Sequence, residues 1–378
     1  MTALSPVAED ALPPLQVAGR LDRLRVGIDA AEVDALLVTG LPNVRYLTGF
    51  SGSAGVLLVT RQSALLVTDG RYRTQAAEQL DAVGLDGSVE LAIGGHQAQR
   101  DALASVARSG AVGRLGLEAD HVTWSAKRRW AEDLAPAEPV PTSGVVEALR
   151  LVKDAGELAR MARAAAIADA ALGEVLALLG QASREEEVAL ALDTAMRRLG
   201  AEDRAFETIV ASGPNAAKPH ARPTTRTIEV GDPVVVDFGA IFEGYRSDMT
   251  RTFCVGGDPP GPLARVFEVV AEAQAAGVAA VRAGVATGDV DKACRDLIAE
   301  AGWRDAFEHG TGHGVGLDIH EAPAVGPGST AILASDVVVT VEPGVYLAGI
   351  GGVRVEDTVV VTVDGCHTLT RFPKDIAA

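Results

Sequence analysis

The sequence predicts two consecutive globular domains, an α/β domain followed by an α+β domain. Three observations support this prediction. The chain has 378 residues, enough for two domains that each bury a core of their own. Short apolar runs alternate with helical patterns in the first third, as in an α/β unit. In the last part a strand–turn–strand pattern occurs twice, which indicates an α+β domain with two similar halves.

The chain begins with a segment that we expect to be a flexible tail over residues 1–14. It carries Glu9 and Asp10 before Pro13 and Pro14, and it lacks the basic start and apolar core of a secretory signal. No stretch of the sequence approaches the ~20 uninterrupted apolar residues that a membrane-spanning helix needs.

The N-terminal domain is expected over residues 15–140. Helical spacing predicts a helix over 71–80, and Gly40-Leu41-Pro42-Asn43 has the composition of a turn. The stretch from Asp133 to Ser143 is rich in Ala and Pro without periodicity, so we interpret it as the linker between the domains. Short apolar runs predict buried strands at 35–38, 54–59 and 64–67.

The second domain is expected over residues 141–378, and it begins with helices. Apolar spacing over 144–179 predicts one long amphipathic helix or two consecutive ones. Ser183 followed by Glu186 has the spacing of a capping box, which predicts a helix over 183–199 with Ser183 as its N-cap. Two further helices are predicted at 263–283 and 287–301.

Two strand hairpins of this domain each carry one carboxylate on each arm. The hairpin over 234–255 contains Asp237 and Asp248, and the hairpin over 337–363 contains Glu342 and Glu356. Asp237 and Glu342 end runs of valine, where an unpaired carboxylate would be costly to bury. Four converging carboxylates would resist ionisation, because like charges raise each other's pKa. Two divalent cations would balance their charge, so the pattern predicts a metal site.

Histidines strengthen this prediction. Three of the seven histidines lie within one glycine-rich stretch, His309 to His320, whose backbone can approach a ligand closely. The alternate glycines disfavour a helix, so this is not the helical motif of zinc proteases. One ligand histidine, His313, with four carboxylates makes a mostly oxygen site, which favours Mn²⁺ or Co²⁺ over a cysteine-rich zinc site. His220 lies in a turn-rich stretch poorly suited to a core.

Composition excludes other classes of function. The formal net charge of −17 disfavours nucleic acids and anionic membrane surfaces as partners, because such a chain repels phosphate. The three cysteines have no metal-site spacing, and we interpret them as reduced structural thiols of a cytoplasmic protein.

The motifs together resemble the pita-bread metallopeptidases, and most closely their proline-specific branch, aminopeptidase P and prolidase. Two segments of the first domain are similar to the N-terminal domain that this branch shares with creatinase: 43–53 (NVRYLTGFSGS) and 68–72 (TDGRY). Five segments of the second domain carry the resemblance to the catalytic domain: 236–240 (VDFGA), 245–252 (YRSDMTRT), 309–317 (HGTGHGVGL), 341–346 (VEPGVY) and 353–357 (VRVED).

The resemblance implies a role for each residue of the site. Asp237 would bind one metal ion, Asp248 and Glu356 would bridge two, and His313 and Glu342 would complete the second. Glu342 would also act as general acid and base. His309 and His320 would stabilise the oxyanion and hold the prolyl residue, and His220 would line the same wall. Arg354 would support the site. The implied metal is Mn(II), with Co(II) and Zn(II) as alternatives, in a homodimer.

The implied reaction is hydrolysis of the bond between an N-terminal residue and a following proline. Aminopeptidase P is preferred, because no insertion is evident that would close the site around the free carboxylate of a dipeptide. Arg222 is a candidate partner for such a carboxylate. Prolidase remains the alternative, and methionine aminopeptidase is disfavoured because it generally lacks the first domain. The alternative of another class is a non-catalytic protein-binding scaffold with the same fold.

Overall fold

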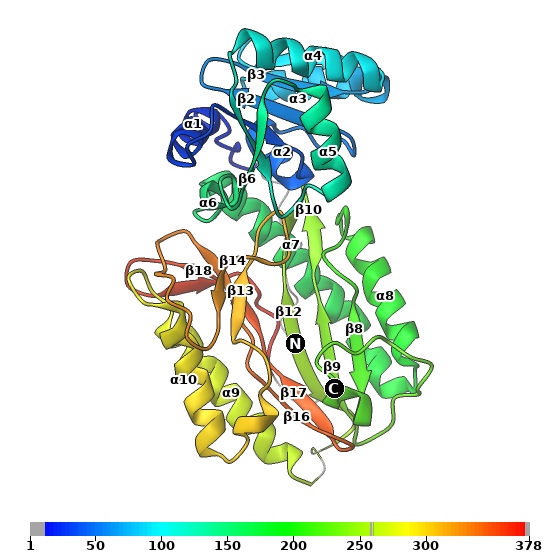
Figure 1. Cartoon of the computed structure of the whole chain (residues 1–378). Coiled ribbons are helices and arrows are strands. Elements are labelled where there is room, and N and C mark those ends of the chain that lie inside the picture. The colour runs from blue at the N-terminus through cyan, green and yellow to red at the C-terminus, as the bar shows by residue number, and fades with distance from the viewer. Residues whose placement is uncertain (1–11, 258, 260, 375–378) are drawn as a thin grey trace. The chain divides into compact units, whose positions relative to one another are not determined.

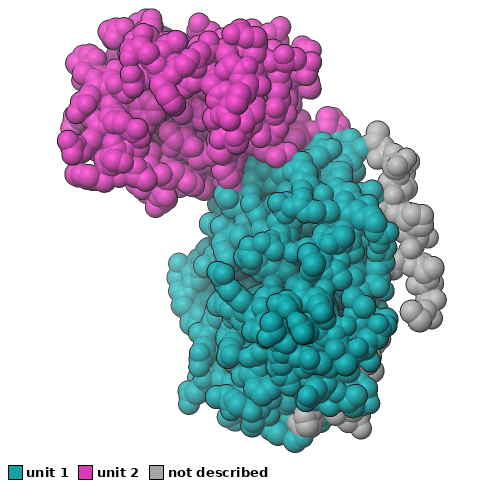
Figure 2. All heavy atoms as spheres, turned by 90° about the vertical axis from the view of Figure 1, so that its right-hand side faces the viewer, with its two compact units in different colours: residues 1–13, 151–378 teal, residues 14–150 magenta. Residues whose placement is uncertain are grey.

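The computed structural model describes residues 12–257, 259 and 261–374, and the chain divides into two compact units. Residues 14–150 form the N-terminal unit, and residues 1–13 and 151–378 form the second unit, called the catalytic unit after the domain that its motifs resemble (Figure 2). The expected flexible tail falls largely on residues 1–11, which lie outside the described residues. None of the helices in the described ranges is long and apolar enough to cross a membrane.

The N-terminal unit is built on one six-stranded sheet with the order β4-β3-β2-β1-β5-β6. Strand β2 is antiparallel to both of its neighbours, β1 and β3, whereas β4 pairs in parallel with β3, β5 with β1, and β6 with β5. The strands are β1 (Ala35–Val38), β2 (Val56–Thr60), β3 (Ala64–Thr68), β4 (Glu90–Ile93), β5 (Arg114–Glu118) and β6 (Glu138–Thr142). The helices are α1 (Arg20–Ala30), α2 (Leu41–Thr48), η1 (Gly70–Tyr72), α3 (Arg73–Ala82), α4 (His96–Ser109), α5 (Trp124–Asp133) and α6 (Glu147–Arg150).

Two predictions for this unit are wrong. The predicted turn at 40–43 is the start of helix α2, where Pro42 occupies the first turn and costs no helical hydrogen bond. The predicted linker over 133–143 contains strand β6, and the unit continues to Arg150. Strand β6 is the last strand of the sheet, where prolines are tolerated because one side needs no ladder partner. The strands predicted at 35–38, 54–59 and 64–67 are confirmed within two residues.

The helices of the catalytic unit pack in two pairs (Figure 1). The region predicted as one or two helices over 144–179 divides, and α7 begins after Asp154, whose carboxylate accepts from the Glu157 amide at 2.9 Å. The capping box of α8 lies one residue later than predicted: Glu187 accepts from the amide of Arg184 at 2.8 Å. The helices are α7 (Ala155–Val175), η2 (Leu176–Gln181), α8 (Glu185–Arg198), η3 (Gly213–Ala217), α9 (Leu263–Ala280), α10 (Thr287–Glu300) and η4 (Arg304–Ala306).

Both predicted hairpins are confirmed, each with its arms broken into shorter strands. In the first, β9 pairs antiparallel with β12, and in the second, β15 pairs with β18 while β16 pairs with β17. The strands are β7 (Asp203–Arg204), β8 (Ile209–Ser212), β9 (Pro233–Phe238), β10 (Ala240–Phe242), β11 (Tyr245–Arg246), β12 (Met249–Cys254), β13 (Gly312–Gly314), β14 (Glu321–Val325), β15 (Val338–Val341), β16 (Gly344–Leu347), β17 (Gly351–Arg354), β18 (Asp357–Val361) and β19 (Cys366–Thr368).

Each hairpin has its own apolar core, formed with one pair of helices. The first core joins α7 and α8 to the β9–β12 hairpin, and it includes Leu172, Leu192 and Val236. The second joins α9 and α10 to the second hairpin, and it includes Val270 and Val341. Because each hairpin packs against its own pair of helices, the carboxylates in its strands or at the strand ends are held by rigid elements.

Candidate metal centre

The four predicted carboxylates come together where the two hairpins meet. Asp237 lies in β9, Asp248 directly before β12, Glu342 directly after β15, and Glu356 directly before β18. One oxygen each from Asp237, Asp248 and Glu356 lie within 4.8 Å of one another. Glu356 is only 1% exposed, and Asp248 is also buried.

This crowding raises the pKa of these carboxyl groups. Burial, with the nearby charges of Glu356, Asp237 and Glu342, raises the pKa of Asp248 well above its usual range. Burial, with the charges of Glu342 and Asp237, does the same for Glu356. Burial is also the main cause that raises the pKa of Glu342 to about 7. Ionised together, these groups would need compensating positive charge.

In two of these carboxylates, a hydrogen bond from the protein fixes one oxygen, and the other oxygen faces the cluster without such a bond. Arg354 donates to Oδ2 of Asp237 at 2.6 Å, and Thr250 donates to Oε2 of Glu356 at 2.7 Å. Oδ1 of Asp237 and Oε1 of Glu356 are buried without a hydrogen-bond partner in the described part of the chain. Outer contacts that fix one oxygen and orient the other are typical of metal ligands. The residues therefore fit a site for divalent cations.

His313 presents a nitrogen to the same cluster. Its Nδ1 lies 3.0 Å from the carbonyl of Gly314, so Nδ1–H donates there and Nε2 carries the free lone pair. Nε2 lies 3.5 Å from Asp248 and 3.4 Å from Glu342. Burial lowers the pKa of His313, which favours the neutral form that binds metals.

A hydrogen-bonded chain that the sequence did not reveal runs from His309 to Asp237. Nε2 of His309 lies 2.9 Å from the hydroxyl of Tyr346, and Arg354 donates to that hydroxyl at 2.7 Å as well as to Asp237. Nδ1 of His309 is bonded to the Gly310 carbonyl at 2.8 Å. Burial, followed by the charge of Arg354, lowers the pKa of His309 to about 4.

The neutral His309 therefore donates from Nδ1 to a carbonyl and accepts at Nε2, and it has no ring N–H left for an oxyanion. This geometry disfavours the oxyanion role expected for His309. The sequence carried one signal for Tyr346, because a tyrosine in an otherwise apolar strand needs a partner for its hydroxyl when buried.

All nine predicted residues line one cavity of about 680 Å³ in the catalytic unit. His220 and His320 are exposed on its wall, and the His320 ring lies edge-to-face against His313 at 4.5 Å between centroids. Burial and the neighbouring His313 lower the pKa of His320. Arg222, the candidate partner for a substrate carboxylate, lines it too. Residues that the sequence did not assign to the site also line it: Phe206, Glu207, Thr208, Ile209, Pro219, Ala221, Pro223, Gly310, Gly312 and Ile319.

Comparisons with known proteins agree with this geometry. The sequence profile described as "Metallopeptidase family M24" matches residues 159–363, which is more than half of the chain. The chain belongs to metallopeptidase family M24. The profile of the "Creatinase/Prolidase N-terminal domain" matches residues 20–152. The fold predicted from the sequence is therefore confirmed: a pita-bread catalytic domain preceded by a creatinase-type N-terminal domain.

Relatives of this M24 chain cover nearly its whole length. A structure described as an Xaa-Pro dipeptidase from Bacillus anthracis has a TM-score of 0.91 and 40% identity, over 96% of this chain and 99% of that one. An X-Pro aminopeptidase from Thermotoga maritima has a TM-score of 0.84 and 34% identity, over 93% and 99%. An uncharacterized peptidase of Bacillus subtilis is 39% identical over 94% and 99%. The chain is a metallopeptidase hydrolase of the proline-specific pita-bread family.

Proposed function

We propose that this M24 peptidase is an Xaa-Pro aminopeptidase that uses two divalent metal ions. The observation that carries the proposal is the buried carboxylate cluster with free oxygens, set in the wall of a histidine-lined cavity. Asp237, Asp248, His313, Glu342 and Glu356 would hold the ions. Mn(II) is the proposed metal, with Co(II) and Zn(II) as alternatives, because oxygen dominates the donor set. Bound there, the ions would lower the pKa of a water molecule and polarise the scissile carbonyl.

Glu342 is the proposed proton carrier. Thr340 donates to its Oε1 at 3.0 Å, and Thr340 in turn accepts from the His313 amide at 3.0 Å. This pair fixes the carboxylate at the cavity wall, beside His313. From there Glu342 takes a proton from the nucleophilic water and delivers it to the prolyl nitrogen, which has no proton of its own in the tertiary amide.

Three histidines and Arg354 are proposed to contact the substrate, stabilise the oxyanion or hold other residues of the site in position. His320 reaches the cavity with an exposed imidazole beside His313 and is the proposed donor to the oxyanion. His220 lines the same cavity and contacts the substrate. His309 acts through Tyr346, since its ring nitrogens are bonded to that hydroxyl and to a carbonyl. Arg354 holds Asp237 and Tyr346 in place.

The choice between longer peptides and dipeptides depends on the cations of the cavity. Arg222 and Arg354 are the arginines that line its described part. Arg354 is 3% exposed and already donates to Asp237, Tyr346 and Thr250, so it is not free for the carboxylate of a dipeptide. This favours the aminopeptidase. Dipeptidase activity is the second candidate, which exposed Arg222 would support.

Hydrolysis of Ala-Pro-Ala and Ala-Pro tests the choice. We expect a higher kcat/KM for the tripeptide and little change for it in Arg222→Ala. Cleavage confined to the dipeptide, lost in Arg222→Ala, would establish the dipeptidase instead. Metal analysis after loading with Mn(II) tests the centre: two ions per chain support it, and none would favour a binding scaffold.

We also propose, from the family resemblance, a cytoplasmic homodimer. Sedimentation of the purified protein should give twice the mass of one chain, and a monomer at micromolar concentration would contradict this.

A further inference from the structure

One loop, which has no regular structure at its tip, forms part of the lining of the cavity. It leaves β8 after Ser212 and returns to β9 at Pro233, and its residues 219–223 line the cavity. His220 and Arg222 are both in this tip. Its one helical element is the short η3 at the start. A loop of this length is costly to hold in one conformation, so contacts at its base must fix it.

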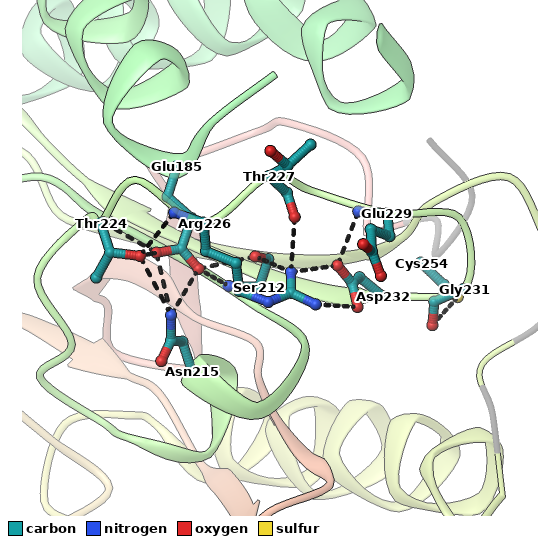
Figure 3. Close-up of polar contacts among 10 residues, drawn as sticks. All are labelled: Glu185, Ser212, Asn215, Thr224, Arg226, Thr227, Glu229, Gly231, Asp232 and Cys254. Carbon is teal, nitrogen blue, oxygen red and sulfur yellow. Dashed lines mark hydrogen bonds and ion pairs between the residues drawn. The ribbon is translucent and has the colours of Figure 1, made fainter. Parts of the chain in front are cut away.

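Glu185 joins the two ends of the part of this loop that carries the tip, residues 213–223. It is the first residue of α8, and its side chain is 0% exposed. Its Oε1 accepts from the amide and hydroxyl of Ser212, both at 2.7 Å, on the outgoing side. Its Oε2 accepts from the amide of Thr224 at 3.0 Å and from its hydroxyl at 2.6 Å, on the returning side. Figure 3 shows this carboxylate between the two segments.

A second group of charges supports the same base (Figure 3). Arg226 donates to the Ser212 hydroxyl at 2.6 Å and to Asp232 at 3.0 Å, so Ser212 links Glu185 to this ion pair. Gly213 has a φ of +51°, and a Cβ there would lie 2.7 Å from both Arg226 and Asp232. The loop therefore turns away from β8 against a charged pair that leaves no room for a side chain.

Negative charge at Glu185 is what the donors require. Burial alone would raise the pKa of Glu185, but the hydrogen bonds from Thr224 and Ser212 outweigh it and hold the pKa below its usual value. A carboxylate offers acceptors on both sides. The side-chain amide of glutamine would turn its NH2 group toward the backbone N–H of either Ser212 or Thr224, whichever way it is oriented.

We propose that Glu185 is a positioning residue, whose carboxylate fixes the base of the 213–232 loop so that His220 and Arg222 face the metal centre. The effect on peptide hydrolysis rests on the proposed function, whereas the effect on the loop does not. Backbone bonds also join α8 to the loop: the amide of Glu185 donates to the Arg226 carbonyl and that of Glu186 to the Thr224 carbonyl, both at 3.1 Å. These remain when the side chain changes, so the variant is expected to fold.

Glu185→Gln tests the proposal, with Glu186→Gln as its matched control. Glu186 is the next residue, is exposed, and loses the same charge. Amide hydrogen exchange is measured over 213–227, and kcat and KM are measured on Ala-Pro-Ala. We expect faster exchange confined to this loop in Glu185→Gln and a roughly ten- to hundred-fold loss of kcat/KM, because the substrate contact of His220 is misplaced. Bound metal should be unchanged, which separates loop position from loss of the metal centre.

Thr224→Val is a milder second variant, because it keeps the carboxylate and the backbone bond of Thr224 to it. It removes the hydroxyl bond to Glu185 and the bond that this hydroxyl accepts from the Arg226 amide, with exposed Thr225→Val as control. It should give a smaller change of the same kind. Unchanged exchange of the loop in both Glu185→Gln and Thr224→Val would overturn the proposal, and so would faster exchange with unchanged kcat/KM. A wild-type protein inactive on all Xaa-Pro peptides would refute the proposed function, and the exchange comparison alone would then decide whether Glu185 holds the loop.

Discussion

We expect Glu342→Gln to stabilise the metal-free protein and, if Glu342 carries the proton as proposed, to abolish catalysis. Glu342 has a pKa of about 7 against a usual value of 4.5, mainly because it is buried. A carboxyl group whose folded pKa is raised favours the folded state at low pH, and its contribution is lost as pH rises through the folded pKa. The metal-free protein should therefore lose stability between about pH 4.5 and pH 7 through this group.

The pKa difference sets the size of the effect. At about 1.4 kcal/mol for each pKa unit, ionising Glu342 in the metal-free fold costs about 3 kcal/mol above pH 7. Glutamine carries no charge, so the variant avoids this cost. The amide also keeps an oxygen for the hydroxyl of Thr340. The expected gain in the free energy of unfolding is about 3 kcal/mol at pH 8 and near zero at pH 4.5.

Urea unfolding in the presence of a chelator measures this gain, with exposed Glu308→Gln as control. With Mn(II) in excess the order should reverse, because the wild type gains the free energy of metal binding and the variant loses a ligand. A variant that is less stable than the wild type at pH 8 in chelator would refute the reasoning, since it would show that Glu342 is not strained by its charge.

Two further substitutions test the support of the metal centre. Thr250→Val removes the donor to Glu356 and should weaken Mn(II) binding by about 10- to 100-fold in calorimetry, whereas Thr287→Val, which removes a buried hydroxyl with no partner in the described ranges, should not. Gly312→Ala would place a Cβ 2.1 Å from the carbonyl of residue 340 and should lower stability by about 3 kcal/mol or more, while Gly365→Ala, with open space around it, should be neutral in thermal unfolding.

The sequence predicted the carboxylates of the site because their signal is local. A carboxylate at the end of a run of valines is costly to bury without a partner, and this pattern occurs once in each hairpin. The family resemblance implied that Arg354 supports the site, but the carboxylate that each supporting group contacts was not predicted, because the two partners are distant in the chain. Arg354 meets Asp237 across 117 positions, and Thr250 meets Glu356 across 106. Only the packed hairpins show which hydroxyl and which guanidinium reach which carboxylate.

The wrong linker has a different physical cause. Pro139 and Pro141 in a stretch rich in alanine indicate a loop when judged by local propensity alone. In the fold they pair with β5 at the end of the sheet, where an edge strand needs donors on one side only. The stretch forms a strand because it lies at the edge of the sheet, and this position cannot be inferred from the local sequence.

Glu185 and Glu356 contrast the surroundings of an acid with a structural role and of an acid proposed to bind a metal ion. Both are buried glutamates, at 0% and 1% exposure. Donors occupy both oxygens of Glu185, and its pKa is lowered; one hydroxyl holds Glu356, its other oxygen has no partner in the described part of the chain, and its pKa is raised. A saturated carboxylate gains nothing further from a cation, whereas a half-satisfied one gains the charge that its burial demands. The supply of N–H and O–H donors around these two buried acids therefore supports the different roles that we propose for them, fixing a loop for Glu185 and binding a metal ion for Glu356.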